Sequence, residues 1–137
     1  MEDFASALPL PLDARPQRTA LSCPDCSGTL TVQIEGSSGY LHFRCRIGHS
    51  FSLLSLLACK EEVLETRLWE SVTALEELVS LLHDLDRAGS PYRNGCPPDE
   101  GRRRVETLQG AAAVLRGLLD ANVPLPLRTA DAADGAC

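Results

Sequence analysis

Apolar and polar residues alternate in the first third of the chain. Leu30, Val32 and Ile34 are each followed by a polar residue, which is the period of a half-buried strand. The run Gly-Ser-Ser-Gly at 36–39 indicates a turn, and the aromatic-rich segment 40–44 returns as a second strand. The pattern predicts a β hairpin, which needs further support because an isolated two-stranded hairpin is only marginally stable.

The period changes to that of a helix after Ser52. This serine is a predicted N-cap, and residues 53–88 contain neither proline nor glycine. Gly89 is a natural stop, because glycine readily adopts the left-handed conformation that ends many helices. Apolar residues recur at every third or fourth position of this predicted helix, at Leu64, Leu68, Val72, Leu75, Val79, Leu82 and Leu85.

A second helix is predicted over residues 99–122, after a connection rich in proline and glycine. Its apolar positions have the same spacing, at Val105, Leu108, Ala112, Leu115 and Leu119. The two patterns together predict an antiparallel helical hairpin. Such a hairpin leaves Trp69, Leu78 and Leu81 under-covered, so we expect them to bind another protein or a second copy in a four-helix bundle.

The two ends of the chain show neither period. Prolines alternate with leucines in segments 8–12 and 124–127, which forbids a helix there. We expect residues 1–21 and 123–137 to be disordered. The leucines of the two proline–leucine segments either lie on the chain's own domain as a stiff spacer or dock in a partner's groove as polyproline II helices.

Composition places the chain among soluble globular proteins of one domain with tails. It has 137 residues, of which 44% are hydrophobic and 23% are charged, with a net charge of −6. The longest dense apolar stretch, 51–58, is far shorter than the ~20 residues of a membrane span. The acidic start lacks the basic region of a secretory signal, so we expect a cytoplasmic protein. The negative charge argues against nucleic acid as a partner.

Cysteine spacing carries the candidate chemistry. Cys23 and Cys26 form a C-x2-C pair, and eighteen residues later Cys45 and His49 form a C-x3-H pair. The hairpin between the pairs brings them together, and three thiolates with one imidazole suit tetrahedral zinc. Four protein ligands leave no open position, so the pattern predicts one structural Zn²⁺ per chain. Gly28 and Gly48 follow where such knuckle turns need a relaxed backbone.

Some alternatives to this ligand set remain open. Cys59 or His42 replaces His49 in two of them. In another, Cys23 and Cys26 are a redox pair, with Cys59 as a further redox thiol of a thiol or zinc redox sensor. A nucleic-acid-binding zinc-ribbon regulator is a third class. The sequence contains no hydrolase elbow, phosphate loop or dinucleotide fingerprint, so we expect no enzymatic activity.

Segments 22–30 (SCPDCSGTL) and 43–52 (FRCRIGHSFS), with the Leu68-Trp69 pair, carry a family resemblance. The chain resembles the zinc-ribbon-plus-helices tail that follows the methylesterase domain in some bacterial CheB-like chemotaxis proteins. The resemblance spans roughly residues 22–120, and the methylesterase domain has no counterpart here. It implies the same metal ligands and a bacterial, cytoplasmic signalling setting, without methylesterase activity. Ser27 stands where the tail usually has a first glycine, which we expect to matter little because Gly28 remains.

These observations predict a small α+β fold. A zinc-ribbon or treble-clef-like hairpin at 22–51 is followed by an α-helical hairpin at 52–122, with helices at about 52–88 and 99–122. We expect a non-enzymatic, zinc-binding protein–protein interaction module of a bacterial signalling or regulatory pathway. Its partner is another protein.

Overall fold

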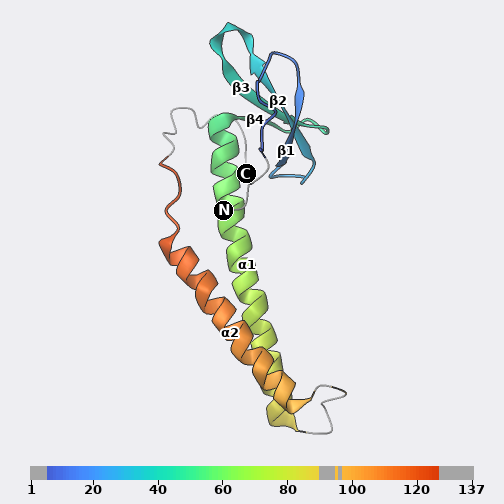
Figure 1. Ribbon diagram of the computed structural model, residues 1–137, viewed down its shortest axis with the longest axis vertical. Helices are drawn as coiled ribbons and strands as arrows, with labels where there is room; N and C mark the ends of the chain where they lie inside the picture. The colour runs from blue at the N-terminus through green and yellow to red at the C-terminus, as the bar shows by residue number, and fades with distance from the viewer. Residues whose placement is uncertain (1–5, 90–94, 96, 127–137) are drawn as a thin grey trace. The chain divides into compact units, whose positions relative to one another are not determined.

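The computed structural model describes residues 6–89, 95 and 97–126 (Figure 1). Four strands come first along the chain and two helices follow them, so the predicted small α+β class is confirmed. The chain divides into two compact units, which are called here the sheet unit (residues up to Val63, with Leu125 and Pro126) and the helical unit (Leu64–Pro124).

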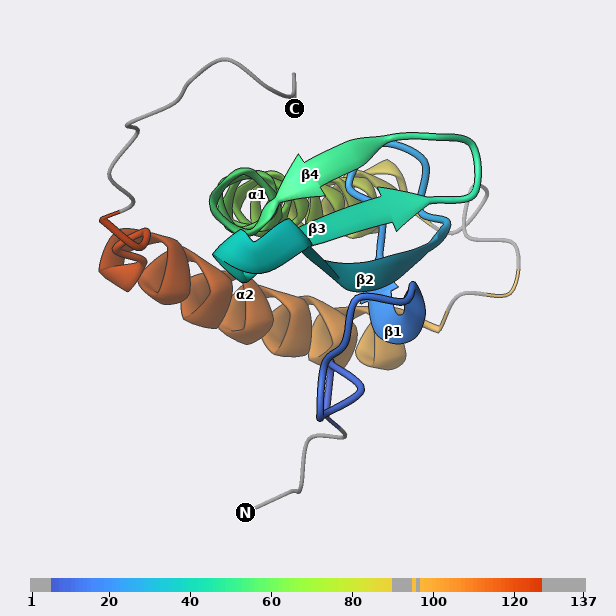
Figure 2. The ribbon, with the colours of Figure 1, turned by 90° about the horizontal axis from the view of Figure 1, so that it is seen from above.

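The sheet unit contains a four-stranded antiparallel sheet in the order β1-β2-β3-β4 (Figure 2). The strands are β1 (Gln17–Ser22), β2 (Thr29–Glu35), β3 (Tyr40–Cys45) and β4 (Ser50–Ser52). The predicted hairpin corresponds to β2 and β3, which are joined by a short 3-10 turn at Gly36–Ser38. The support that this hairpin needs comes from β1 and β4, which pair with its two outer edges.

One face of the sheet carries the core of this unit. Val32, Phe43 and Phe51 lie side by side in neighbouring strands and are buried. Leu56 and Cys59, from the first turns of the following helix, pack against them. The first turns of the helix therefore cover the buried face of the hairpin.

The expectation of a disordered N-terminal segment is wrong for its described part. Residues 17–22 form β1, which pairs with β2 through a register that shifts between Arg18 and Ser22. Because β1 is short and its register shifts midway, its residues do not show the alternation of apolar and polar positions that is typical of a strand. A strand forms here because β2 would otherwise be left with unpaired backbone groups along that edge.

The first proline–leucine segment also lies on the sheet unit. Leu8 and Leu12 pack against its core, and the N–H of Ile34 donates to the carbonyl of Asp13 at 2.9 Å. The leucines of this segment therefore lie on the chain's own domain, as the first of the two interpretations expects. Residues 1–5, and Leu127 of the second segment with the tail after it, lie outside the described residues. Residues 122–126 have no regular secondary structure.

The helix α1 (Leu53–Ala88) begins and ends where the sequence predicts. The Ser52 hydroxyl accepts the N–H of Ser55 at 3.1 Å, which is the bond of an N-cap. Gly89 has φ +83°, the left-handed conformation of a C-terminal stop. The second helix, α2 (Pro98–Ala121), starts one residue before the predicted position, because proline lacks only an N–H that the first turn does not use. Among the described residues, no helix is long and apolar enough to cross a membrane.

In the helical unit, α2 runs antiparallel to the distal part of α1 (Figure 1). The predicted seam joins them, and it buries Val72 of α1 with Val105, Leu108 and Ala112 of α2. Arg116 of α2 donates to Glu76 of α1 through Nε at 3.1 Å, so these two residues lie at the same level of the hairpin. Leu64 was expected in the seam but is exposed, because this level places it beyond the end of α2.

Thr19 stabilises the irregular part of β1. Its buried hydroxyl donates to the carbonyl of Leu30 at 2.8 Å and accepts the N–H of Leu21 at 3.0 Å. Thr19→Val would leave two backbone groups without this partner, so we expect the free energy of unfolding to fall by about 1–3 kcal/mol. Urea unfolding of the purified protein, followed by circular dichroism, measures this change.

Thr31→Val is the matched control. The Thr31 hydroxyl donates to the carbonyl of Arg44 at 3.1 Å on the exposed face of the sheet, where water can replace it. We expect this variant to unfold within about 0.5 kcal/mol of the wild type. An equal fall in the free energy of unfolding of the two variants would show that burial of the Thr19 hydroxyl is not what makes its hydrogen bonds stabilising.

Candidate metal centre

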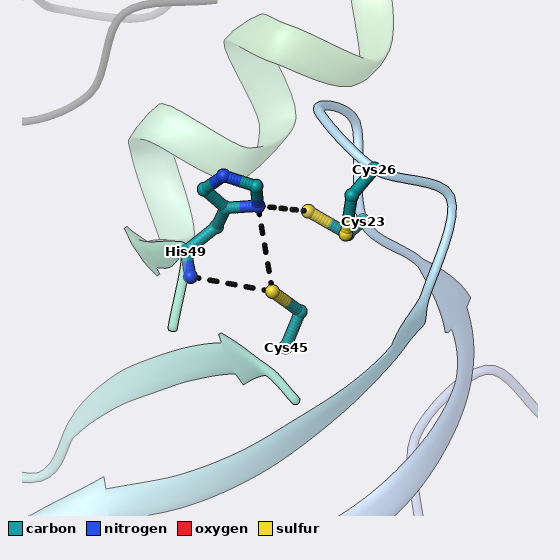
Figure 3. Close-up of side chains that lie close together, drawn as sticks. All are labelled: Cys23, Cys26, Cys45 and His49. Atoms are coloured by element: carbon teal, nitrogen blue, oxygen red, sulfur yellow. Dashed lines mark hydrogen bonds between the residues drawn. The ribbon is translucent and has the colours of Figure 1, made fainter. Parts of the chain in front are cut away.

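Three cysteines and one histidine converge at one end of the sheet. One ligand atom from each of Cys23, Cys26, Cys45 and His49 lies within 4.8 Å of the others. Cys23 directly follows β1, Cys45 is the last residue of β3, and His49 directly precedes β4. Figure 3 shows the imidazole of His49 turned toward the sulfur atoms of Cys23 and Cys45. The two sequence motifs therefore form one cluster.

Two of the distances between ligand atoms fit a tetrahedral ion. The Nδ1 atom of His49 lies 3.6 Å from the Sγ atom of Cys23 and 3.5 Å from that of Cys45. Bonds of about 2.0–2.3 Å to a central ion place two tetrahedral ligands about 3.3–3.8 Å apart. The histidine therefore presents Nδ1 to the site at the distance that a shared ion requires.

The first knuckle is the turn from Cys23 to Gly28. The N–H of Cys23 donates to the carbonyl of Gly28 at 2.6 Å, and the N–H of Ser27 donates to that of Cys23 at 2.9 Å. Ser27 has φ +61°, whereas Gly28 does not have a positive φ. The expectation that Gly28 relaxes this turn is wrong, because the residue before it takes the left-handed conformation. That conformation costs an L-residue roughly 1–2 kcal/mol.

The second knuckle is the turn from Cys45 to His49. The N–H of Cys45 donates to the carbonyl of His49 at 3.0 Å, and the N–H of Gly48 donates to that of Cys45 at 3.1 Å. The N–H of His49 also points at the Sγ atom of Cys45, at 3.2 Å. Gly48 has φ +103°, so glycine is required here, as the sequence predicts.

The knuckles shift the pKa values of two thiols in opposite directions. Burial raises the pKa of Cys45, but the N–H groups of His49, Ile47 and Gly48 and a hydrogen bond from Cys26 lower it more, to about 7. The Gly28 N–H lowers the pKa of Cys26, but desolvation and the Cys23 and Cys45 side chains raise it more, to above its ordinary value. Cys45 is thus favoured as a thiolate, the form that binds metals.

Lys60 supports the first knuckle from α1. Its ammonium group donates to the carbonyl of Ser22 at 2.5 Å and to the hydroxyl of Ser22 at 3.2 Å. Ser22 directly precedes Cys23, so the lysine ties the second turn of α1 to the start of the centre. The sequence offers no signal for this role, because the two residues are far apart in the chain and belong to different periodic patterns.

The two alternative ligands lie apart from this cluster. His42 is on the opposite face of β3, where its Nε2 atom lies 3.2 Å from the hydroxyl oxygen of Ser50. Its Nδ1 atom lies 4.0 Å from a carboxylate oxygen of Glu35. Cys59 lies in the core of the sheet unit at 2% exposure and is disulfide-bonded, so it is not a member of the cluster. His49 is the fourth member of the cluster.

The predicted binding residues of the helical unit are exposed but do not form one surface. Trp69 and Leu78 are nine residues apart, which is about half a revolution of an α-helix. They therefore lie on opposite flanks of α1. Leu81 lies about 60° from Leu78, on the same flank. All three side chains are exposed.

Comparison with protein-family models, curated proteins and solved structures finds no match to this chain. The resemblance to the CheB-associated tail therefore stays a prediction. The chemistry of the centre follows from its own ligands and distances.

The two knuckle glycines give a test of the backbone geometry. A Cβ atom at position 48 would meet no other atom within 4 Å, so Gly48→Ala adds backbone strain alone. We expect it to lower the free energy of unfolding of the metal-loaded protein by roughly 1–2 kcal/mol. Chelator competition should show weaker metal binding in the same variant.

Gly28→Ala is the control for this variant. Its Cβ atom would lie 3.4 Å from the Sγ atom of Cys26, and its backbone needs no positive φ. We expect a smaller loss of stability than in Gly48→Ala. If Gly28→Ala were the more damaging variant, the assignment of the strained position to Gly48 would be wrong.

Proposed function

We propose that Cys23, Cys26, Cys45 and His49 bind one structural Zn²⁺, and that the chain is a zinc-stabilised, non-enzymatic protein-interaction module. The observation that carries this proposal is the cluster of four ligand atoms within 4.8 Å of one another. Their Sγ–Nδ1 distances of 3.5 and 3.6 Å support a shared tetrahedral ion.

The donor set favours zinc among the common metal ions. Thiolates are soft ligands that select Zn²⁺, Cu⁺ and iron–sulfur clusters over Mg²⁺ or Ca²⁺, and imidazole also suits zinc. A site with three thiolates and one imidazole is a common structural zinc site. Because the protein supplies all four ligands, no coordination position is left for water or substrate. The centre is therefore a structural one in this proposal.

Zinc would act on the fold of the sheet unit. It would join the turn after β1 to the turn between β3 and β4, so it would close the open end of the hairpin that β2 and β3 form, opposite the turn at Gly36–Ser38. Its binding free energy then becomes folding free energy of this small unit. The helical unit presents exposed apolar side chains to partners, and the resemblance to the CheB-associated tail supports a cytoplasmic, bacterial signalling setting.

Zinc content tests this proposal directly. We expect elemental analysis of the purified, untagged protein to find one zinc per chain. Cys45→Ser and His49→Gln each remove one ligand, so zinc should fall well below one per chain and the melting temperature of the sheet unit should fall. Bound Co²⁺ gives an independent readout, because its visible absorption reports tetrahedral thiolate ligation.

His42→Gln is the matched control for His49→Gln, since it alters the histidine outside the cluster. It should keep one zinc per chain and the Co²⁺ spectrum of the wild type. A Cys45→Ser protein that kept both its zinc and its melting temperature would overturn the proposed site. Reversible loss of zinc under mild hydrogen peroxide, with a disulfide in its place, would instead favour a redox sensor.

A further inference from the structure

A second apolar seam runs along both helices of the helical unit. In α1 it is spaced by four, three and four residues, and in α2 by three, four and three. This is the heptad spacing of helices that pack side by side. The second seam consists of Ala74, Leu78, Leu81 and Leu85 in α1, of which Leu85 is shared with the end of the first seam, and of Ala111, Val114, Leu118 and Ala121 in α2.

The hairpin covers Leu85 in part and leaves the rest of this second seam exposed. The exposed fractions are 38% for Leu78, 55% for Leu81, 63% for Val114 and 53% for Leu118. The first seam, by contrast, buries Val72 and Leu108 almost fully. Scattered exposed leucines are ordinary on a protein surface, but a second heptad register shared by two helices is not.

Helix geometry places the two halves of the second seam on the same side of the hairpin. Leu78 and Leu81 directly precede the first-seam residues Val79 and Leu82, and Val114 likewise precedes Leu115. Each half is therefore turned by about 100° from the first seam, in the same sense about its own helix. Because the helices are antiparallel, turns in the same sense lead to the same side. The result is one apolar face across both helices.

We propose that a second copy of this chain docks on the second seam and forms a four-helix bundle, with α1 of each copy against α2 of the other. Each helix of such a bundle contacts two neighbours on adjacent faces, as the two seams require. This inference names the partner of the helical surface in the proposed function. It rests on the helical unit and does not depend on the zinc.

Side-chain size favours α1 against the partner's α2. The α1 half of the seam carries three leucines, whereas Gly110 and Gly117 directly precede seam positions of α2. A Cβ atom on either glycine would meet nothing within 4 Å in the chain itself. Each glycine costs an exposed helix about 1 kcal/mol relative to alanine, and the hairpin makes no use of the space. A partner's leucines would fill it.

Charge favours the same arrangement. Glu70, Glu77 and Asp84 recur every seven residues along the flank of the α1 seam. Two α1 helices side by side would bring these acidic rows together, which is unfavourable. The same heptad position of α2 is occupied by Arg103, Gly110 and Gly117, none of which is acidic. A two-fold axis parallel to the helices gives the α1-to-α2 contact twice.

The first test is the oligomeric state of the zinc-loaded chain and of charge variants. We expect sedimentation equilibrium to show a dimer of the wild type at tens of micromolar. Leu81→Glu and Val114→Glu would each bury a carboxylate in the seam, so the dimer Kd should rise at least about tenfold. Ser80→Glu and Ala113→Glu change the neighbouring exposed positions off the seam and should leave the Kd within about twofold.

The second test addresses the arrangement by mixing two variants. The Glu76–Arg116 pair places Leu81 level with Ala111, so the proposed axis sets Leu81 of one copy near Ala111 of the other. Leu81→Glu and Ala111→Lys proteins should each self-associate more weakly than the wild type. An equimolar mixture should form heterodimers more tightly than either protein alone.

Each outcome decides one part of the proposal. A monomeric wild type at these concentrations, or equal loss of dimer in the control variants, would overturn the docking site. If the mixture of the two variants associated no more tightly than either variant alone, the α1-to-α2 arrangement would be wrong. Zinc content and helical circular dichroism, measured on every sample, separate the dimer proposal from the zinc proposal. A zinc-loaded monomer would overturn only the dimer. A zinc-free dimer would overturn only the metal centre.

Discussion

The convergence of two turns from distant parts of the chain is the constraint on which the sheet unit depends. Cys23 and Cys45 are ligand candidates and also belong to the buried core, beside Leu30 and Phe43. The candidate ligand cluster and the hydrophobic core of this unit therefore share residues. A unit of about 60 residues buries too small a fraction of its surface to be robust on packing alone. A metal ion bound by the converged side chains, as proposed above, would add its binding free energy to the stability of this unit.

Strong local signals made much of this fold predictable. Ser52 and Gly89 mark the ends of α1 through chemistry that acts within one turn, and the alternation in β2 shows which face is buried. The two cysteine motifs give the ligand set because their spacing and the hairpin between them agree. Each of these features depends on neighbours in the sequence, so a pattern of residue types records it.

The features that the sequence did not show depend on distant partners. β4 has three residues, too few for a period, and it forms because β3 has an edge to pair. The register of β1 shifts midway, which breaks its alternation. Ser27 adopts a left-handed conformation that its side chain does not favour, and only the closure of the knuckle explains it. Tertiary context, rather than local propensity, decides all three.

Lys60 is the one lysine of the chain, since the remaining basic side chains are all arginine. Its ammonium group is held against Ser22, beside the first knuckle. Reagents that modify primary amines therefore have a single side-chain target, and that target lies where α1 meets β1. The rate at which this amine reacts would therefore report whether α1 stays packed against β1, without a foreign label.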